Sequence, residues 1–409
     1  MGGVLRRSLL ALLVVAATAC TAPRTETPLA TATAAPVQRQ LLLVEGDAAT
    51  QLVDLATGKP AATLPGGLLS PTKDLVVRLE AAGGTTVVHG VDVDGLPMLK
   101  VEVPGEYHLS SAYGAAPSGF SPNGTWLVLV SRDPSESRFA VIDVARNKLV
   151  QTVALGTRFT FDAIHNDGSA MYLIEHPVPG ATAYNVRLYD LAAKVLRPDI
   201  IFDKTQIAQF DPTVGLMDGT FHVSVAPKAG DWSYGLYMRP NGKPFVHALN
   251  VPGRYAQCIV DLAGSWTAAS LFSMALSDYG RRLYVVDTAG GSVSAIDALT
   301  QKVVRTASFG TRPGTADPRA TSAVISPDGT RLYATAARGI AMLQTADLSL
   351  RGWAAPDLAA RSLALSADGA RIYALAGDAV MVVDASSGRV LSQLVSATGA
   401  RAIHVIRAP

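Results

Sequence analysis

Three stretches near the end of the chain repeat one pattern of apolar and turn residues. They start at Ala275, Val324 and Ala364 and read ALSDYGRRLYVVDTAGGSVSAIDALTQKVVRT, VISPDGTRLYATAARGIAMLQTADLSLRG and ALSADGARIYALAGDAVMVVDASSGRVLSQ. Each unit predicts four strands: an apolar strand, an Arg-Leu/Ile-Tyr strand after a Ser-x-Asp-Gly-like turn, a Val/Ile-rich strand, and a last strand after a Thr or Ser-Gly turn. Such repetition indicates a repeat architecture, in which each unit buries its apolar surface against its neighbours.

The turn in each unit explains its own residues. Proline presets φ at the first central position of a type I turn, Asp or Asn bonds its own backbone, and Gly accepts a positive φ. The same turn occurs as SPNG at 121–124 and, in degraded form, as NDG at 166–168 and SPTK at 70–73. We therefore expect a tight antiparallel hairpin at each of these places.

The second strand of each unit gives the number of units. These strands are predicted to start near Leu41, Leu75, Trp126, Met171, Phe221, Leu283, Leu332 and Ile372. Eight units over about 370 residues average roughly 46 residues, which is a normal size for the blade of a β-propeller. The unit at Phe221 lacks the Ser-x-Asp-Gly turn, so a ring of seven blades with a long insertion is the alternative.

The two ends of the repeat region complement each other. The segment from Gln40 begins at what would be a second strand, and Ala402 to Ile406 forms a lone strand with no continuation. Together they make one complete blade. The sequence thus predicts an all-β chain whose ring is closed by pairing of its N- and C-terminal strands, because closure removes the exposed edges of an open array.

The repeats resemble the YVTN-type β-propeller repeats of bacterial surface and exported proteins. Residues 326–333, SPDGTRLY, and 282–286, RLYVV, match that consensus best. The resemblance is strong over 270–396, fair over 118–196 and weak between 200 and 265. It implies a propeller fold and an exported, extracytoplasmic protein, and it implies no reaction.

The first 20 residues read as an export signal. Arg6 and Arg7 precede an apolar run from Leu9 to Ala17 that is too short to span a bilayer, and small residues precede Cys20. Cys20 at this place resembles the lipobox cysteine of bacterial lipoproteins, which is diacylated and becomes the mature N-terminus. The lipobox prefers Leu where this chain has Ala17, and Ala-x-Ala also fits ordinary secretory cleavage, so both readings stay open.

The segment after Cys20 and the second cysteine complete the organisation of the chain. Residues 21–39 are mostly Thr, Ala and Pro and predict an extended tether, so the expected parts are a signal peptide at 1–20, the tether, and one propeller domain at 40–409. Cys258 would be unpaired, and we interpret it as a small buried apolar side chain.

The charge of the mature chain argues against nucleic acid as a partner. The chain has 35 Lys and Arg against 33 Asp and Glu, and removal of Arg6 and Arg7 leaves the two numbers equal. A nucleic-acid binder usually carries a strong basic excess. The expected contacts are the membrane through the lipid anchor and an unknown protein, peptide or glycan ligand, and we expect a monomer.

No local motif predicts catalysis, a cofactor or a metal. The sequence lacks Gly-x-Ser-x-Gly, a P-loop, His-Glu-x-x-His and Cys-x-x-Cys-His, so no catalytic residue, cofactor or metal site is assigned. The Asp92-Val93-Asp94-Gly95 sequence is interpreted as a hairpin turn, because the further acidic residues of an EF-hand are missing. The histidines are scattered, at His89, His108, His165, His176, His222, His247 and His404.

Repeated carboxylates are interpreted as architecture. An Asp ends the third strand of several units, where an Asx-type turn explains it better than a ring of ligands. These residues are Asp54, Asp143, Asp190, Asp297 and Asp384.

Two segments depart from the repeat and are the places where a function would be added. The first is 106–119, with Tyr107, His108 and Tyr113, and the second is 202–233, with Asp211, Asp218, His222, Asp231 and Trp232. Irregular connections between blades are the structural alternative.

Two function classes follow. The first is a membrane-anchored binding or scaffolding lipoprotein without catalysis. The second is a propeller enzyme, lactonase-like or dehydrogenase-subunit-like, with side chains from several loops at the channel mouth. The second requires that His or Arg side chains and carboxylates meet there.

Overall fold

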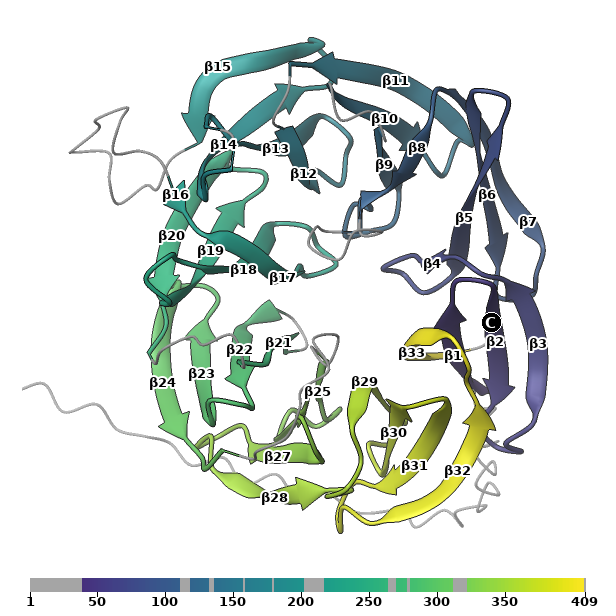
Figure 1. The fold of residues 1–409 in the computed structure, drawn as a ribbon, viewed down its shortest axis with the longest axis vertical. Coiled ribbons are helices and arrows are strands. Elements are labelled where there is room, and N and C mark those ends of the chain that lie inside the picture. Colours follow the sequence, from purple (N-terminus) through teal and green to yellow (C-terminus); the bar gives the residue numbers. More distant parts are fainter. Residues whose placement is uncertain are drawn as a thin grey trace, which may run out of the picture. The chain divides into compact units, whose positions relative to one another are not determined.

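A computed structural model describes residues 39–110, 118–131, 136–156, 159–178, 180–201, 217–263, 270–277, 280–311 and 322–407. Within these residues the chain forms eight antiparallel blades of four strands, arranged around a ring (Figure 1). The predicted signal peptide, the tether and Cys20 lie outside the described residues. No described residue belongs to a helix long and apolar enough to cross a membrane.

In each of the first four blades, the strands are named here in order from the channel outward. Blade 1 is β33 (Ala400–Arg407), β1 (Gln40–Gly46), β2 (Ala49–Asp54) and β3 (Pro60–Pro65); blade 2 is β4 (Leu68–Leu69), β5 (Leu75–Ala82), β6 (Thr85–Asp92) and β7 (Pro97–Pro104). Blade 3 is β8 (Tyr107–Leu109), β9 (Trp126–Ser131), β10 (Ser137–Asp143) and β11 (Lys148–Leu155); blade 4 is β12 (Phe159–Ile164), β13 (Ala170–Glu175), β14 (Ala183–Asp190) and β15 (Val195–Ile201). A short strand, β16 (Met217–Asp218), pairs with β14.

The other four blades have the same order. Blade 5 is β17 (Thr220–Val225), β18 (Trp232–Met238), β19 (Pro244–Asn250) and β20 (Tyr255–Asp261); blade 6 is β21 (Phe272–Leu276), β22 (Arg282–Asp287), β23 (Ser292–Asp297) and β24 (Lys302–Ser308). Blade 7 is β25 (Ala323–Ile325), β26 (Arg331–Thr335), β27 (Ile340–Gln344) and β28 (Leu350–Ala354); blade 8 is β29 (Ala360–Leu365), β30 (Arg371–Ala376), β31 (Ala379–Asp384) and β32 (Val390–Ser396).

The two ends of the domain share blade 1, as the sequence predicts. Strand β33 pairs with β1 in an antiparallel register that sets Leu42 opposite Val405, and the two strands lie side by side in Figure 1. Arg401 of β33 also binds Glu45 of β1 at 2.8 Å. The ring is therefore closed by its own ends, and the alternative of seven blades is wrong.

The prediction for the second strand of blade 5 is wrong. Phe221 lies on β17, the innermost strand of that blade, and the second strand is β18. The turn between them, at 226–231, contains Pro227 and Gly230 but no Ser-x-Asp-Gly sequence. The count of blades is unaffected, because β17 and β18 belong to the same unit.

The core lies between neighbouring blades. Strand β13 is a typical central strand, with five consecutive buried residues, because a blade packs against another blade on each of its two faces. Sheets covered on both faces have continuous apolar strands rather than alternating ones. Tyr184 of blade 4, for example, packs in one buried cluster with Phe245 of blade 5.

Candidate functional site

The turns between first and second strands lie on one face of the ring, which we call the turn face. The turns of blades 2, 3, 6, 7 and 8 repeat one hydrogen-bond pattern, in which a serine hydroxyl accepts the backbone N–H at or just before the start of the second strand. In blades 7 and 8 the serine hydroxyl donates to the turn aspartate at 2.5 Å, from Ser326 to Asp328 and from Ser366 to Asp368. The same hydroxyl accepts the backbone N–H that opens the second strand, at 2.9 Å for Arg331. These polar residues thus build hairpins, as predicted.

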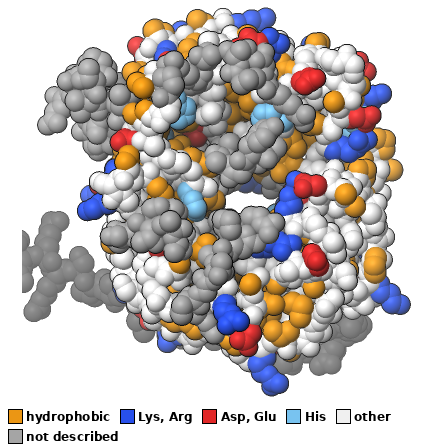
Figure 2. All heavy atoms as spheres, viewed as in Figure 1, with side chains coloured by type: hydrophobic (Ala, Val, Ile, Leu, Met, Phe, Trp, Pro, Cys, Tyr) orange, Lys and Arg blue, Asp and Glu red, His pale blue; other side chains and the backbone are white. Residues whose placement is uncertain are grey.

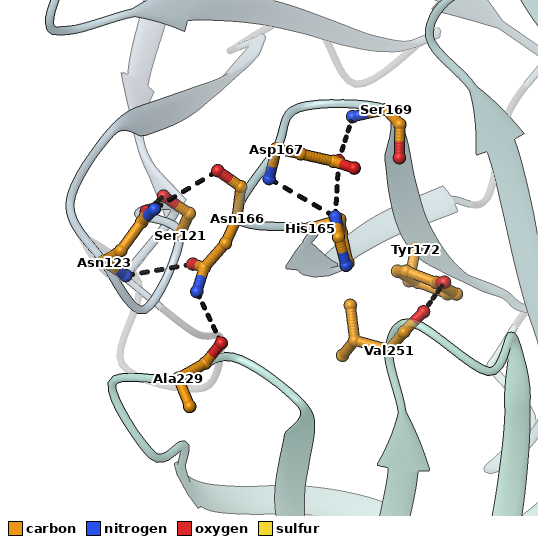
Figure 3. Close-up of polar contacts among 9 residues, drawn as sticks. All are labelled: Ser121, Asn123, His165, Asn166, Asp167, Ser169, Tyr172, Ala229 and Val251. Atoms are coloured by element: carbon orange, nitrogen blue, oxygen red, sulfur yellow. Dashed lines mark hydrogen bonds and ion pairs between the residues drawn. The ribbon is translucent and has the colours of Figure 1, made fainter.

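Blade 4 carries His165 at the serine position of its turn. Its Nδ1 contacts the Asp167 carboxylate, as Figure 3 shows. The Asp167 backbone N–H lies 3.3 Å from the same nitrogen. His165 therefore has a structural role in the turn.

Neighbouring turns on this face are joined by side-chain amides (Figure 3). Asn166 of blade 4 accepts the backbone N–H of Asn123 of blade 3 at 3.0 Å and donates to the Ala229 carbonyl of blade 5 at 2.8 Å. Asn123 donates back to the Asn166 carbonyl at 3.2 Å. Blades 3, 4 and 5 are thereby held in a fixed arrangement at their channel ends.

The aspartates that end third strands form Asx-type turns, as predicted. Asp54, for example, accepts the backbone N–H groups of Ala56 and Thr57, each at 3.0 Å. In the other units Asp143 accepts the backbone N–H of Arg146, Asp190 that of Ala193, Asp297 that of Thr300 and Asp384 that of Ser387. Asp92 likewise accepts the N–H groups of Asp94 and Leu96, which confirms the hairpin turn there.

The space inside the ring contains cavities on the turn face. A cavity of about 490 Å³, which we call the channel cavity, is lined by β12, β17 and the neighbouring turns, including Asp162, His222 and Lys228. A second, of about 740 Å³, is lined by the inner strands of blades 6, 7, 8 and 1 and by Lys73. Figure 2 shows an opening at the centre, with Lys or Arg side chains at its edge.

Much of the surface of Lys73 is accessible to water, and the residue lines the second cavity. The surrounding protein lowers the pKa of its ammonium group by desolvation. Because Val225 and Ala226 line both turn-face cavities, the two spaces adjoin at blade 5.

Three inner strands carry a β-bulge with an ionisable residue at the extra position. The register slips after Phe161 in β12, after Phe221 in β17 and after Ala360 in β29, so no cross-strand partner faces Asp162, His222 or Arg361. Bulges re-aim side chains and are frequent next to functional sites. They place Asp162 and His222 on the wall of the same cavity.

The environments of these three side chains differ. The Arg361 guanidinium donates to the carbonyls of Gly377 and Ala400, at 2.7 and 2.6 Å. Burial lowers the pKa of His222, whose ring has a hydrogen bond with the backbone of Phe272. Asp162 is 8% exposed, and burial raises its pKa to about 7.

Asp162 also lines a cavity between blades 4 and 5, which we call the interblade cavity. It has about 290 Å³, and its wall includes Thr160, Thr182 and Gly219, which lie at or next to the starts of β12, β14 and β17. Its other walls are largely apolar and aromatic, from Phe161, Ile174, Ala181, Phe221 and Tyr237, with His176 among them. Asp162 therefore lies on the wall of both the channel cavity and the interblade cavity.

A buried aromatic cluster backs the interblade cavity. Tyr237 stacks on Tyr184 with ring centroids 5.0 Å apart, and His247 lies 5.9 Å from Tyr237. His247 is 3% exposed, its Nε2 has no hydrogen-bond partner among the described residues, and burial lowers its pKa to about 4. The imidazole of His247 is therefore neutral at physiological pH.

The structure does not bring the remaining histidines together. His108 lines a separate cavity of about 570 Å³ with Arg78 and Arg401, and His165 belongs to a turn. His89 contacts Glu80 and His404 contacts Glu45, both at 3.3 Å. The described residues contain no group of three His, Cys, Asp or Glu side chains placed to hold a metal ion.

The irregular segments contribute unequally. His222 reaches the channel cavity with Trp232, which also stacks 6.1 Å from Tyr234. Asp218 accepts from the Thr182 hydroxyl at 2.5 Å, and Asp231 is exposed. Tyr107 is buried in the core between blades 2 and 3. Tyr113 and Asp211 lie outside the described residues, as does the side chain of Cys258.

Comparison with known proteins supports the fold alone. AztD from Citrobacter koseri aligns over 91% of this chain and 99% of its own length, with a TM-score of 0.60 and 12% identity. Its apo structure gives 0.57 at 12% identity, over 90% and 98% of the two chains. The chain is an eight-bladed β-propeller. The dihydro-heme d1 dehydrogenase NirN, in complex with DHE, aligns with a TM-score of 0.54 and 15% identity, over 88% of this chain and 74% of that protein.

No protein-family model matches the sequence. No curated protein matches it either.

Proposed function

We propose that this chain is an exported, lipid-anchored propeller of the YVTN type that binds a peptide, glycan or partner protein through its channel. The observation that carries this proposal is the pair of adjoining cavities on the turn face, of about 490 and 740 Å³. Both are lined by a mixture of apolar strand residues and a few polar groups, which is typical of binding sites. The signal-like start and Cys20 support the export and the anchor.

The chemistry of the channel fits binding more readily than turnover. The repeated polar residues are used in turns, and the ionisable groups that reach the channel cavity are Asp162, His222 and Lys228. Asp162 has no hydrogen bond to a candidate nucleophile within the described part of the chain. Binding requires only shape and a few placed polar groups.

A substitution that fills the channel tests the proposal. Ala226 lines both turn-face cavities, so Ala226→Trp should obstruct them. Ala61, on the outermost strand of blade 1, is exposed, and Ala61→Trp is the matched control. We expect peptide and glycan arrays probed with residues 40–409 to give ligands that A61W retains and A226W loses. Ligands retained equally by both variants would place binding elsewhere.

One observation favours the enzyme as a second candidate. A carboxyl group with a pKa near 7, Asp162, lines the same cavity as a histidine, His222. General acid–base catalysis uses groups with pKa values near the working pH. A screen with lactone, phosphoester and dye-reduction substrates tests it: turnover that is lost in both D162N and H222A would establish the enzyme.

A further inference from the structure

The Asp162 side chain is buried without a partner among the residues that the structure describes. It is 8% exposed, and within the described part of the chain it takes part in no hydrogen bond or ion pair. Burial of a carboxyl group without hydrogen bonds is unfavourable, and buried ionisable groups are normally paired. Arg361, at the bulge of blade 8, has two backbone carbonyls as partners, which shows how this fold satisfies such a residue.

The bulge in β12 allows the Asp162 side chain to line the two cavities. The register slips between Phe161 and Ala163, so Asp162 is the extra residue and is not constrained by a cross-strand neighbour. It lines both the channel cavity and the interblade cavity. A ligand group could therefore reach its carboxyl group from inside the ring.

The surroundings of Asp162 determine which charge the ligand group beside it should carry. In the interblade cavity the other ionisable side chains are His176 and Tyr237, and burial lowers the pKa of His176 and raises that of Tyr237. Both are therefore neutral at pH 7. On the channel side His222 is held neutral by burial, and Lys228 belongs to an exposed turn. No described cation compensates the carboxylate.

The aromatic walls suit the same kind of ligand. Phe221 and Tyr237 meet edge to face with ring centroids 5.5 Å apart, and Phe161 lies on the same cavity. Aromatic faces attract a desolvated ammonium group and accept an apolar stem beside it.

We propose that Asp162 binds the ammonium group of a ligand whose apolar stem occupies the aromatic interblade cavity. This deepens the proposed function, on which it rests, by naming the chemical group that the propeller recognises. A charge-assisted hydrogen bond between ammonium and carboxylate would supply the partner that Asp162 lacks. The same chemistry is offered by a free small amine and by a lysine side chain of a peptide.

Two pairs of probes test the proposal on the domain 40–409. Phenethylammonium is compared with phenethyl alcohol, which has the same stem without charge. Acetyl-Ala-Ala-Lys-Ala-Ala-amide is compared with its norleucine counterpart. Isothermal titration should show binding of the charged member of at least one pair, and the pair that responds identifies the source.

Matched variants and pH separate recognition from structure. Asp162→Asn keeps the shape and should weaken the charged probe at least tenfold, whereas Asp378→Asn, at an exposed turn, should not. Asp162 must be ionised to bind the cation, and its pKa in the folded protein without ligand is about 7. The wild-type affinity should therefore fall about tenfold from pH 8 to pH 6. At pH 6 binding should release close to one proton, and D162N should show neither effect.

The D162N variant separates Asp162 from its titratable neighbours. Burial raises the pKa values of Tyr172, Tyr184 and Tyr237, which therefore stay neutral from pH 6 to 8. Burial lowers the pKa values of His176 and His222 below 6.5, and a pH response that came from either imidazole would persist in D162N. A near-ultraviolet circular dichroism spectrum of D162N that matches wild type excludes misfolding as the cause of lost binding.

The proposal is overturned if no charged probe binds, or if one binds with the same affinity in D162N and at both pH values. Array ligands that A226W loses and D162N retains would leave the proposed function standing while refuting the ammonium site. Array ligands that both A226W and D162N retain would refute both.

Discussion

Trp126 of blade 3 lies against Gly168 in the turn of blade 4, so closely that a Cβ atom at Gly168 would fall 2.2 Å from the indole ring. Gly168 also has a φ of +71°. Gly329 occupies the same turn position in blade 7 with the same φ, and a Cβ there would meet nothing within 4 Å. The two glycines thus separate the backbone requirement of the turn from the packing between blades.

We predict that Gly168→Ala destabilises the domain more than Gly329→Ala. Both variants place alanine in the left-handed region at a cost of about 1–2 kcal/mol. Only the first forces the Trp126 ring away, which adds on the order of 1–3 kcal/mol by analogy with overpacked cores. Urea denaturation of the two variants measures the difference, and equal midpoints would show that the indole ring moves freely.

Asp162 should contribute to the free energy of unfolding of the wild-type domain by an amount that decreases as pH rises. The pKa of this group is about 7 in the folded chain against 3.8 for the free side chain, so the folded state binds more protons between these values. The contribution is therefore fully present below pH 4 and is lost by pH 8, on the order of 4 kcal/mol. Asp162→Asn should match wild type at pH 4 and exceed it at pH 8.

The comparison needs a charge-matched control. Asp378→Asn removes a carboxylate from an exposed turn and should keep the wild-type difference between pH 4 and pH 8. D162N curves that run parallel to wild type across this range would mean that the carboxyl group is solvated in the folded protein.

His247 should give the opposite dependence. Its pKa is about 4 in the folded chain and 6.5 in the free side chain, so the unfolded state binds more protons between these values. Its contribution is present above pH 6.5 and is lost as pH falls to 4, on the order of 3 kcal/mol. His247→Phe should remove this loss, as measured by urea denaturation at pH 4.5 and 7. The two effects oppose each other, so single variants are needed, and an unchanged slope in H247F would contradict the prediction.

The predicted anchor is tested by fractionation. If Cys20 carries two acyl chains, their buried methylenes contribute about 0.8 kcal/mol each and hold the protein on a membrane. Cys20→Ala should move it to the soluble fraction. Wild-type protein found wholly in the soluble extracytoplasmic fraction would refute the lipoprotein interpretation and favour ordinary secretion.

Closure of the ring is tested by truncation. Deletion of residues 401–409 removes nearly all of β33 and leaves the edge of β1 unpaired, so we expect aggregation or a large loss of thermal stability. Deletion of 408–409 alone, beyond the end of β33, is the control and should melt like the full domain. Equal melting of the long truncation would show that the terminal pairing contributes little.

Much of the fold could be predicted because its signals are local. Turn chemistry at Ser326 and Asp328, and Asx-type turns such as that of Asp54, require only residues a few positions apart. The repeat then fixes the order of strands. Blade 5 was misaligned because its turn at 226–231 carries none of that chemistry, and Phe221 begins an apolar stretch equally suited to either strand.

The candidate site could be predicted only in part. His222 was singled out because it lies in an irregular segment, but Asp162 was missed. One signal was present: Asp162 is three residues before the first residue of its turn, where other units have Met274, Ala323 and Leu363. Its lack of a partner and its place on two cavities depend on the packing of blade 4 against blade 5, which no local pattern contains.

Because blade 1 contains strands from both ends of the domain, it is completed late during synthesis. Strand β1 is made before the other described strands and its inner neighbour β33 is made after them, so blade 1 stays incomplete until the other seven blades have been produced. Contacts this distant in sequence are slow to form and leave intermediates with exposed strand edges. Until then the inner edge of the strand that carries Leu41, Leu42 and Leu43 is open to pairing with another chain.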